Sequence, residues 1–386
     1  MAMDGIRIID LTRVLAGPWA TQHLADQGAD VIKVEPPGGD ETRRFGPVID
    51  GHSTYYLSAN RNKRSIVLDL KTEAGRAVLH ELLASADVLM ENFRPGVLAR
   101  LGFPWEELHA RYPRLVVVAI HAFGDTGDPA WVARPGYDLA LQALGGGASI
   151  TGQPDGPPAK YGNSITDLVA GLLANQAVLT ALLRREKTGR GQKIVINMLQ
   201  AQAACLAYHA TRHVVTGYVE PRRGTAHGGL VPYRFFPCGD GYLAVACGND
   251  AIWQRLRTAL ALPDHPHWRT NVERVADREA VDAAVQSALD RLTLDEADAL
   301  LAANRVPGGP VLTVDQVMAH PQVTTVPVQH PAFGEVPLTG PVFTTDTTRT
   351  DHTCPPELGE HRDAILSELG LDGEAIADLA AKGAFG

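Results

Sequence analysis

Cysteine is scarce in this sequence, and its placement argues against two common kinds of site. The 386 residues include four cysteines, and these form no C-x-x-C pair. No cysteine–histidine group has the ligand spacing of a zinc site, so we expect no metal and no disulfide framework. Unpaired thiols are typical of a reducing compartment, and the N-terminal stretch MAMDGIRIIDLTRV lacks the long apolar segment of a signal peptide. We therefore expect a cytosolic (cytoplasmic) protein. The four cysteines are Cys205, Cys238, Cys247 and Cys354.

Basic residues are outnumbered by acidic ones. The chain has 35 lysines and arginines against 44 aspartates and glutamates, which gives a formal net charge of −9. This balance argues against a general nucleic-acid-binding surface but leaves room for a local basic patch that binds a phosphorylated small molecule. With 45% hydrophobic and 20% charged residues the chain can bury a large core, and its length suits two domains.

The beginning of the chain lacks the glycine-rich fingerprint of dinucleotide-binding proteins. Ile6–Leu11 has the pattern of a buried strand, a helix is expected from Gly17 to about Gln27, and Ala29–Glu35 follows as a second strand. This order predicts the start of a parallel α/β sheet. The turn after the first strand reads TRVLAGP in place of G-x-G-x-x-G, which argues against NAD-dependent chemistry.

One long stretch carries a single charge. From Gly162 to Leu183 only Asp167 is charged. The leucines and valines that follow it are spaced by three and four residues, and alanine and glycine fill much of the rest, which predicts a helix buried almost all round. The run is interrupted by polar residues and is expected to be too short for a membrane span, which needs about 20 apolar residues.

Asp167 is expected at the start of this helix, behind a small polar loop. An aspartate there can cap the helix, because it accepts backbone N–H groups at the positive end of the helix dipole. It can also be a nucleophile or base, because a carboxylate shielded from water can attack an acyl carbonyl and form a covalent intermediate. The two interpretations are compatible, and the spacing alone does not choose between them.

The pattern of elements predicts two domains. Strands alternate with helices in the first half, whereas helical patterns dominate between about 225 and 325. We therefore expect a large α/β domain from 1–220 and 326–386, and a small helix-rich α+β domain at 225–325. Further strands are expected at Lys63–Leu70, Asp87–Met90, Leu115–Ile120, Lys193–Met198 and Tyr242–Cys247. Further helices are expected at Thr72–Ser85, Gly136–Leu144, Leu199–Thr216, Ala251–Ala261, Val272–Leu292 and Leu294–Asn304, with two short ones after Gly359.

Eight short segments form an ordered set along the chain. They are Asp4-Gly5, LAGP (Leu15–Pro18), GADVIKVEPPGGD (Gly28–Asp40), NKRSIVLDLK (Asn62–Lys71), ADVLMENFRPG (Ala86–Gly96), LGF (Leu101–Phe103), TDLVAGLLA (Thr166–Ala174) and KTGRGQ (Lys187–Gln192). Together they resemble the family III CoA-transferases, such as formyl-CoA:oxalate and carnitine CoA-transferases, and the related α-methylacyl-CoA racemases. The resemblance extends to the LGEHRDAIL ending at Leu358–Leu366.

The resemblance implies a fold, an assembly and a site. The expected fold is a large Rossmann-like α/β domain built from both chain ends plus a small domain, and two copies interlock into a homodimer. The expected substrates are an acyl-CoA and a small carboxylic acid, with no tightly bound cofactor and no nucleic-acid or membrane partner. Asp167 matches the catalytic aspartate. The residues that match CoA-contacting positions are Leu15, Ala16, Leu68, Lys71, Asn92, Phe93, Arg100, Tyr137 and Asp138.

The sequence departs from the formyl-CoA transferases in two places. Pro36 stands where those enzymes have an arginine, so the phosphate contact of that arginine stays an open question for this chain. Their four-glycine loop is also absent, and Arg223–Gly229 is the nearest substitute. Basic residues of the same region could recognise a second carboxylate of a dicarboxylic acceptor; they are Arg222, Arg223, His227 and Arg234.

Three functions are open at this point. The first is CoA transfer from an acyl-CoA to an acid through an aspartyl-CoA thioester on Asp167. The second is racemisation of a 2-methylacyl-CoA, which in the related branch uses a histidine in a GHD motif. The same slot here reads Gly136-Tyr137-Asp138, so that base is missing. The third is CoA binding without turnover, for which the carboxylate of Asp167 would have no purpose.

Overall fold

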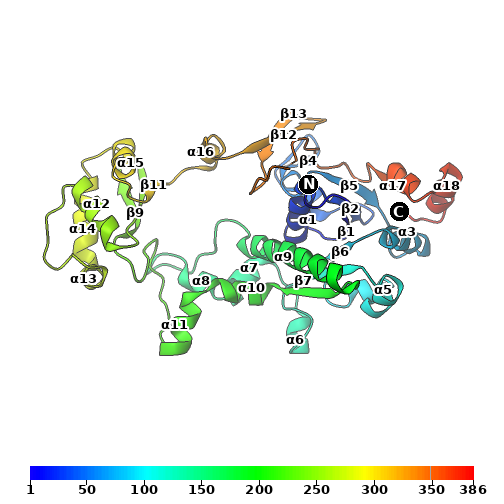
Figure 1. Ribbon diagram of the computed structural model, residues 1–386, viewed down its shortest axis with the longest axis horizontal. Helices are drawn as coiled ribbons and strands as arrows, with labels where there is room; N and C mark the ends of the chain where they lie inside the picture. Colours follow the sequence, from blue (N-terminus) through cyan, green and yellow to red (C-terminus); the bar gives the residue numbers. More distant parts are fainter. Residues whose placement is uncertain (348) are drawn as a thin grey trace. The chain divides into compact units, whose positions relative to one another are not determined.

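The computed structural model describes residues 1–347 and 349–386, and the chain forms two compact units. The large unit comprises Met1–Gly147, Tyr161–Val215 and Gln322–Gly386, so both chain ends belong to it (Figure 1). The small unit comprises Ala148–Lys160 and Thr216–Pro321. It includes a segment near 150 that the sequence pattern grouped with the large domain. That segment is tied to it because the backbone of Gly224 donates to the carbonyl of Gly152 at 2.9 Å.

A six-stranded parallel sheet forms the centre of the large unit. Its strand order is β5-β2-β1-β6-β7-β8. Numbered along the chain, these six strands have the order of the doubly wound Rossmann fold, whose reversal lies between the first and fourth strands, here β1 and β6. The strands are β1 (Arg7–Asp10), β2 (Asp30–Glu35), β5 (Lys63–Val67), β6 (Val88–Glu91), β7 (Val116–His121) and β8 (Lys193–Asn197).

Helices cover both faces of this sheet. Neighbouring strand residues point to opposite sides, and because both sides are apolar, both need to be buried. Ile8 belongs to one core cluster and Ile9 to the other. The first cluster includes residues of α1 (Ala16–Asp26), α7 (Asp138–Leu144), α9 (Ile165–Thr188) and α10 (Met198–Cys205). The second includes residues of α3 (Glu73–Ala84), α4 (Val97–Arg100), α5 (Trp105–Arg111), α17 (Arg362–Glu368) and α18 (Gly373–Ala381).

Helix α9 differs from its prediction in two ways. It has 24 residues and, by length and composition alone, is apolar enough to cross a membrane, so the prediction that it is too short was wrong. It is also not buried all round. One face, with Ala170, Ala174 and Val178, is fully buried in the core beside α1. Opposite it, exposed leucines form what we call the α9 leucine strip, with Leu172 exposed by 51%, Leu179 by 46% and Leu183 by 69%.

The remaining elements of the large unit are short. The predicted helix 199–216 is two helices, α10 and α11 (Tyr208–Thr216), because the chain breaks at Ala207, whose φ is +47°. The others are η1 (Glu41–Arg44), β3 (Val48–Ile49), β4 (His52–Ser53), α2 (Thr54–Leu57), α6 (Pro129–Val132), β12 (Thr325–His330) and β13 (Gly334–Thr339). The short helix α8 (Gly147–Ile150) lies at the division between the units.

The small unit packs helices against a three-stranded antiparallel sheet of order β11-β10-β9. The strand β9 was not predicted, since its pattern includes Pro237. The predicted helix 272–292 is divided at Asp277, whose carboxylate accepts the indole N–H of Trp268 at 2.7 Å. The elements are β9 (Tyr233–Cys238), β10 (Gly241–Ala246), α12 (Asp250–Ala259), α13 (Asn271–Ala276), α14 (Arg278–Leu289), α15 (Leu294–Ala303), β11 (Gly308–Pro310) and α16 (Val314–Met318).

Candidate active site

A cavity of about 510 Å³ lies in the large unit, next to the carboxyl ends of β1, β6 and β7. Ligands of open α/β sheets bind outside the carboxyl ends of the strands, where the strand order reverses. The segments after β1 and β6 supply much of the cavity wall. The lining residues are Arg13, Val14, Leu15, Ala16, Glu41, Asn92, Phe93, Arg94, Pro95, Val97, Arg100, Ile120, Ala122, Phe123, Val132, Arg134, Pro135, Gly136, Tyr137, Asp167 and Met198.

The cavity brings together seven of the ten site residues expected from the sequence. These are Leu15, Ala16, Asn92, Phe93, Arg100, Tyr137 and Asp167. The other three lie elsewhere in the large unit. Leu68 is buried in the core on the face that carries α3, Lys71 is exposed, and Asp138 is buried beside the start of α9. Pro36 is not among the lining residues either.

The cavity wall is strongly basic. It carries four arginines against Glu41 and Asp167. Arg13 lies 3.8 Å from Glu41 and stacks over the ring of Phe93 at 5.0 Å. Within residues 1–347 and 349–386, the other three arginines have no carboxylate partner: Arg94, Arg100 and Arg134. Only Arg100 was expected from the sequence, although Arg94 belongs to the same ENFRPG segment.

Asn92 contributes to this wall by fixing the neighbouring loop. Its side-chain oxygen accepts the backbone N–H of Arg13 at 2.9 Å, and its amide donates to the Arg13 carbonyl at 2.7 Å. Both ends of the amide are therefore engaged with Arg13. The expectation that this residue contacts CoA was an extrapolation from the family motif. In this structure its side chain connects the segments after β1 and β6.

The start of α9 is capped by a different aspartate from the one the sequence suggested. Asp138, the first residue of α7, accepts the backbone N–H of Thr166 at 2.9 Å through one oxygen. Its other oxygen accepts from the amide of Gln142 at 2.8 Å. Asp138 is 8% exposed, so these bonds satisfy a buried charge.

Asp167 stands one residue further into α9 and is left without such bonds. Burial, and then the negative charge of Asp138, raise the pKa of Asp167 from 3.8 to about 7. No hydrogen bond from the described residues offsets these two effects. A carboxyl group with such a pKa is partly ionised at neutral pH, as perturbed groups at functional sites often are.

Two further residues near the site were not singled out by the sequence. Burial, followed by the charges of Asp167, Asp138 and Asp40, raises the pKa of Tyr55, so its hydroxyl stays neutral. His121 is the second of these residues. It is the last residue of β7, is 4% exposed, and lies 3.3 Å from a carboxylate oxygen of Glu91. The other oxygen of Glu91 accepts the backbone N–H of Phe93 at 2.6 Å and thereby supports the cavity wall.

The residues proposed for a second substrate carboxylate belong to the small unit. Two of them already have acidic partners there: Arg223 lies 2.7 Å from Glu220, and Arg234 lies 3.2 Å from Asp282. Arg222 donates to the carbonyl of Gly156 at 2.7 Å. His227 accepts the backbone N–H of Gly229 at 3.0 Å.

One group of potential metal ligands escaped the sequence analysis because its members are far apart in the chain. The nitrogens of His52 and His330 and the carboxylate of Glu357 lie within 4.8 Å of one another. Nδ1 of His330, however, accepts the backbone N–H of Ala332 at 3.1 Å. In the neutral ring the other nitrogen then carries the proton and is not free to ligate a metal. The two rings also meet edge to face, which is a packing contact.

Comparison with known proteins agrees with this geometry. Residues 3–362 match the family model described as CoA-transferase family III. The chain belongs to this family, and it is a transferase. Its large parallel sheet and its cavity at the strand ends are therefore those of a family III CoA-transferase.

Among similar proteins, two relatives are named for the same acid. The chain is 40% identical to a succinate–glutarate CoA-transferase of Agrobacterium fabrum, with 95% of each chain covered. It is 38% identical to the human succinyl-CoA:glutarate CoA-transferase, with 99% of this chain and 89% of the relative covered. A solved CaiB/BaiF family protein from Brucella suis has 38% identity and a TM-score of 0.84, covering 95% of this chain and 99% of that one.

Proposed function

We propose that this enzyme transfers CoA from an acyl-CoA to a small carboxylic acid through an aspartyl-CoA thioester on Asp167. The proposal is carried by the carboxylate of Asp167, which lines the cavity and accepts no hydrogen bond from the described residues. A carboxylate that is only partly solvated and has no hydrogen-bond partner is a better nucleophile than one in water. The cap function, which would occupy its lone pairs, belongs to Asp138.

The reaction proceeds by four acyl exchanges. The Asp167 carboxylate attacks the donor thioester carbonyl, and the C–S bond breaks to give a mixed anhydride and CoA thiolate. The thiolate attacks the aspartyl carbonyl, which releases the donor acid and leaves an aspartyl-CoA thioester. The acceptor carboxylate attacks this thioester and forms a second anhydride with release of the thiolate. The thiolate then attacks the acceptor carbonyl, which yields the new acyl-CoA and restores the Asp167 carboxylate. No proton or electron is gained or lost overall.

The unpaired arginines support CoA as the carrier. CoA bears several phosphate charges, and guanidinium groups bind phosphate through paired N–H donors. Arg94 and Arg100 flank the turn after β6 and suit this part of the carrier. Family membership makes a CoA thioester the expected substrate.

We propose further that the acceptor is a dicarboxylic acid. The two relatives named above are glutarate enzymes, and a dicarboxylate needs a second cation besides the reacting end. Arg134 is the candidate from the cavity, since it has no carboxylate partner in the described chain and lies over the ring of Trp131 at 4.7 Å. Replacing Arg134 by Gln should raise KM for glutarate or succinate by about tenfold and should leave KM for a monocarboxylate of similar length unchanged.

The racemase alternative finds less support. A two-base proton exchange needs a second base near the substrate α-carbon. Among the described residues that line the cavity there is no histidine, and the slot of the GHD motif holds Tyr137. Deuterium incorporation at the α-carbon of a 2-methylacyl-CoA, in the absence of any acceptor acid, would be the result that favours this alternative.

We also propose that the enzyme is a homodimer, interlocked as the family resemblance implies. The α9 leucine strip supports it, because three neighbouring leucines with roughly half or more of their surface exposed favour association. The same helix begins beside Asp167, so a partner that covers the strip would also steady the helix that carries the nucleophile.

The test of the covalent step is a trapping experiment. Incubation with an acyl-CoA donor and hydroxylamine should convert Asp167 to a hydroxamate that mass spectrometry locates, and the wild-type enzyme should lose activity in parallel. The variant Asp167→Ala should bind CoA within about threefold of wild type and lose transfer by about a thousandfold or more. Retention of most of the transfer rate by this variant would disprove the nucleophile assignment.

A further inference from the structure

The loop between β1 and α1 has an unusual backbone. Val14 has φ of +68°, in the left-handed region that β-branched residues rarely adopt. Such a conformation is strained and persists only where neighbours enforce it. Val14 and the adjacent Arg13, Leu15 and Ala16 all line the cavity. The shape of this loop therefore decides part of the wall that faces the substrate.

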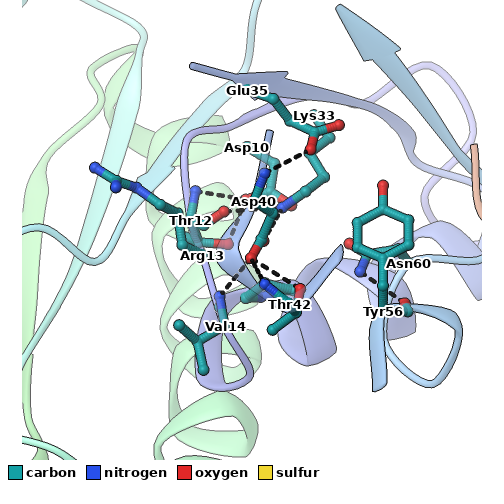
Figure 2. Close-up of polar contacts among 12 residues, drawn as sticks. Asp10, Thr12, Arg13, Val14, Lys33, Glu35, Asp40, Thr42, Tyr56 and Asn60 are labelled. Carbon is teal, nitrogen blue, oxygen red and sulfur yellow. Dashed lines mark hydrogen bonds and ion pairs between the residues drawn. The ribbon is translucent and has the colours of Figure 1, made fainter. Parts of the chain in front are cut away.

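A buried lysine is hydrogen-bonded to the backbone of this loop. Lys33 lies in β2 and is fully buried. Its ammonium group donates to the carbonyl of Thr12 at 2.9 Å and to a carboxylate oxygen of Asp40 at 2.9 Å (Figure 2). One ammonium group thus joins the residue two positions before Val14 to the segment after β2.

Asp40 completes the connection from the other side. Its second carboxylate oxygen accepts the backbone N–H of Val14 at 3.3 Å, together with the backbone and side chain of Thr42 at 3.0 and 2.8 Å (Figure 2). The backbone N–H of Asp40 donates to Glu35 at 2.9 Å. Lys33 and Asp40 together therefore fix both a carbonyl and an N–H of the loop, while the amide of Asn92 fixes Arg13 between them.

The pair stays charged throughout the neutral range. Burial would raise the pKa of Asp40, but the charge and hydrogen bond of Lys33, together with the hydrogen bonds from Thr42, outweigh it and lower this pKa to about 2. Burial would likewise lower the pKa of Lys33, but the charges of Asp40, Asp10 and Glu35 raise it. Buried ion pairs seldom add net stability over apolar residues of the same volume. A gain in stability therefore does not explain why a buried ion pair is present here. The hydrogen bonds of the pair with the loop explain it better.

We infer that Lys33 and Asp40 are positioning residues that hold residues 12–14 in the shape that binds the CoA carrier. This inference rests on the proposed function, since it takes the cavity to be the CoA site. Neither side chain lines the cavity, so both act through the backbone of Thr12 and Val14. Nothing in this role involves the reacting carbonyl, so the effect belongs in the affinity for the carrier and not in the chemical step.

The test compares two buried aspartates by calorimetric CoA binding and by steady-state kinetics. Asp40→Asn is the test variant. Asp26→Asn is the matched control, because Asp26 is also fully buried and pairs with Arg61 at 2.6 Å, but has no contact with the loop. We expect Asp40→Asn to weaken CoA binding and raise KM for acyl-CoA by about tenfold, with kcat changed less than about twofold. Asp26→Asn should lower the melting temperature comparably and leave CoA affinity unchanged.

Each outcome bears on a different statement. If wild-type enzyme binds CoA and Asp40→Asn binds it equally well, or if both variants lose affinity alike, this inference is overturned and the proposed function stands. If the wild-type enzyme itself does not bind CoA, the proposed function fails and takes the inference with it.

Two further variants guard against a loss of folding in Asp40→Asn. The double variant Lys33→Met with Asp40→Leu removes both charges together, which leaves no unpaired buried charge, and it should show the same loss of CoA affinity. Adding Val14→Gly to Asp40→Asn should recover part of the affinity, because glycine adopts positive φ without strain. If Val14→Gly recovered no CoA affinity, the strained conformation of Val14 could not be the reason why Asp40→Asn loses affinity.

Discussion

The carboxylate of Asp138 accepts the backbone N–H of Thr166 at 2.9 Å, and this one bond divides two tasks between two neighbouring aspartates. Asp138 caps the N-terminal end of α9, and Asp167 accepts no hydrogen bond from the described residues, which leaves it free for the role we propose. The arrangement also brings two carboxyl groups close enough for the charge of one to raise the pKa of the other.

Activity should depend on pH through the ionisation of Asp167. Because the pKa of this group is raised to about 7, kcat/KM should climb as the pH increases through this value and then level off. Asp138→Asn removes the nearby charge but keeps an oxygen that can accept from Thr166. Its pH profile should therefore rise at lower pH than that of the wild type. A wild-type profile that is flat between about pH 5 and 8 would contradict the raised pKa.

The same group should reduce stability as the pH rises from 3.8 to about 7. A carboxyl group whose pKa is raised from 3.8 to about 7 binds a proton more tightly when folded, so stability is lost as the pH rises through this interval. Asp167→Asn cannot ionise and should be more stable than wild type at about pH 8, by on the order of 3 kcal/mol. The gain should shrink toward about pH 4. Chemical denaturation at both pH values measures the difference, and an equal gain at both would contradict it.

The basic wall of the cavity should control affinity for the CoA carrier. Arg100→Gln should raise KM for acyl-CoA by about tenfold and flatten its dependence on salt, because one phosphate contact is lost. Arg111→Gln is the control, since Arg111 is exposed and does not line the cavity. Equal effects from the two variants would point to the overall charge of the protein and against a specific contact.

The α9 leucine strip should matter for assembly. Light scattering of the wild-type enzyme should give twice the chain mass of 41.3 kDa. Leu183→Glu places a charge in the strip and should shift the equilibrium toward a single chain, whereas Val272→Glu, at an exposed valine of the small unit, should not. A monomeric wild-type enzyme at micromolar concentration would contradict the proposed dimer.

Local pattern was enough to predict much of the large unit. The apolar runs around Ile8 and Val117 predicted buried strands, and the helices between them predicted the parallel sheet. The breaks at Ala207 and Asp277 were missed because residues with ordinary helix propensity stand there, and tertiary contacts such as that of Trp268 with Asp277 decide the conformation. Exposure of Leu183 was missed for a related reason: an apolar pattern does not distinguish a core from an uncovered surface.

In the site, too, features with a local sequence signal could be predicted and features that depend on distant contacts could not. Asp167 could be singled out because it is the one charge in a long apolar stretch, and the family motif led to Arg100 and Tyr137. The roles of Asp138 and Asn92 could not be predicted, because each depends on a contact with a segment distant in sequence. Arg134 gave no signal at all, since nothing local separates an arginine on a cavity wall from one in solvent.

The reversal of strand order between β1 and β6 has a consequence for redesign. The same crevice serves nicotinamide cofactors in proteins whose first turn is rich in glycine, whereas here the turn is TRVLAGP with Val14 in a left-handed conformation. The strand order thus determines where a ligand binds, and the segments after β1 and β6 determine which ligand fits. An engineer who wished to exchange one carrier for another could leave all six strands untouched and rewrite those segments together with the buried charges that brace them.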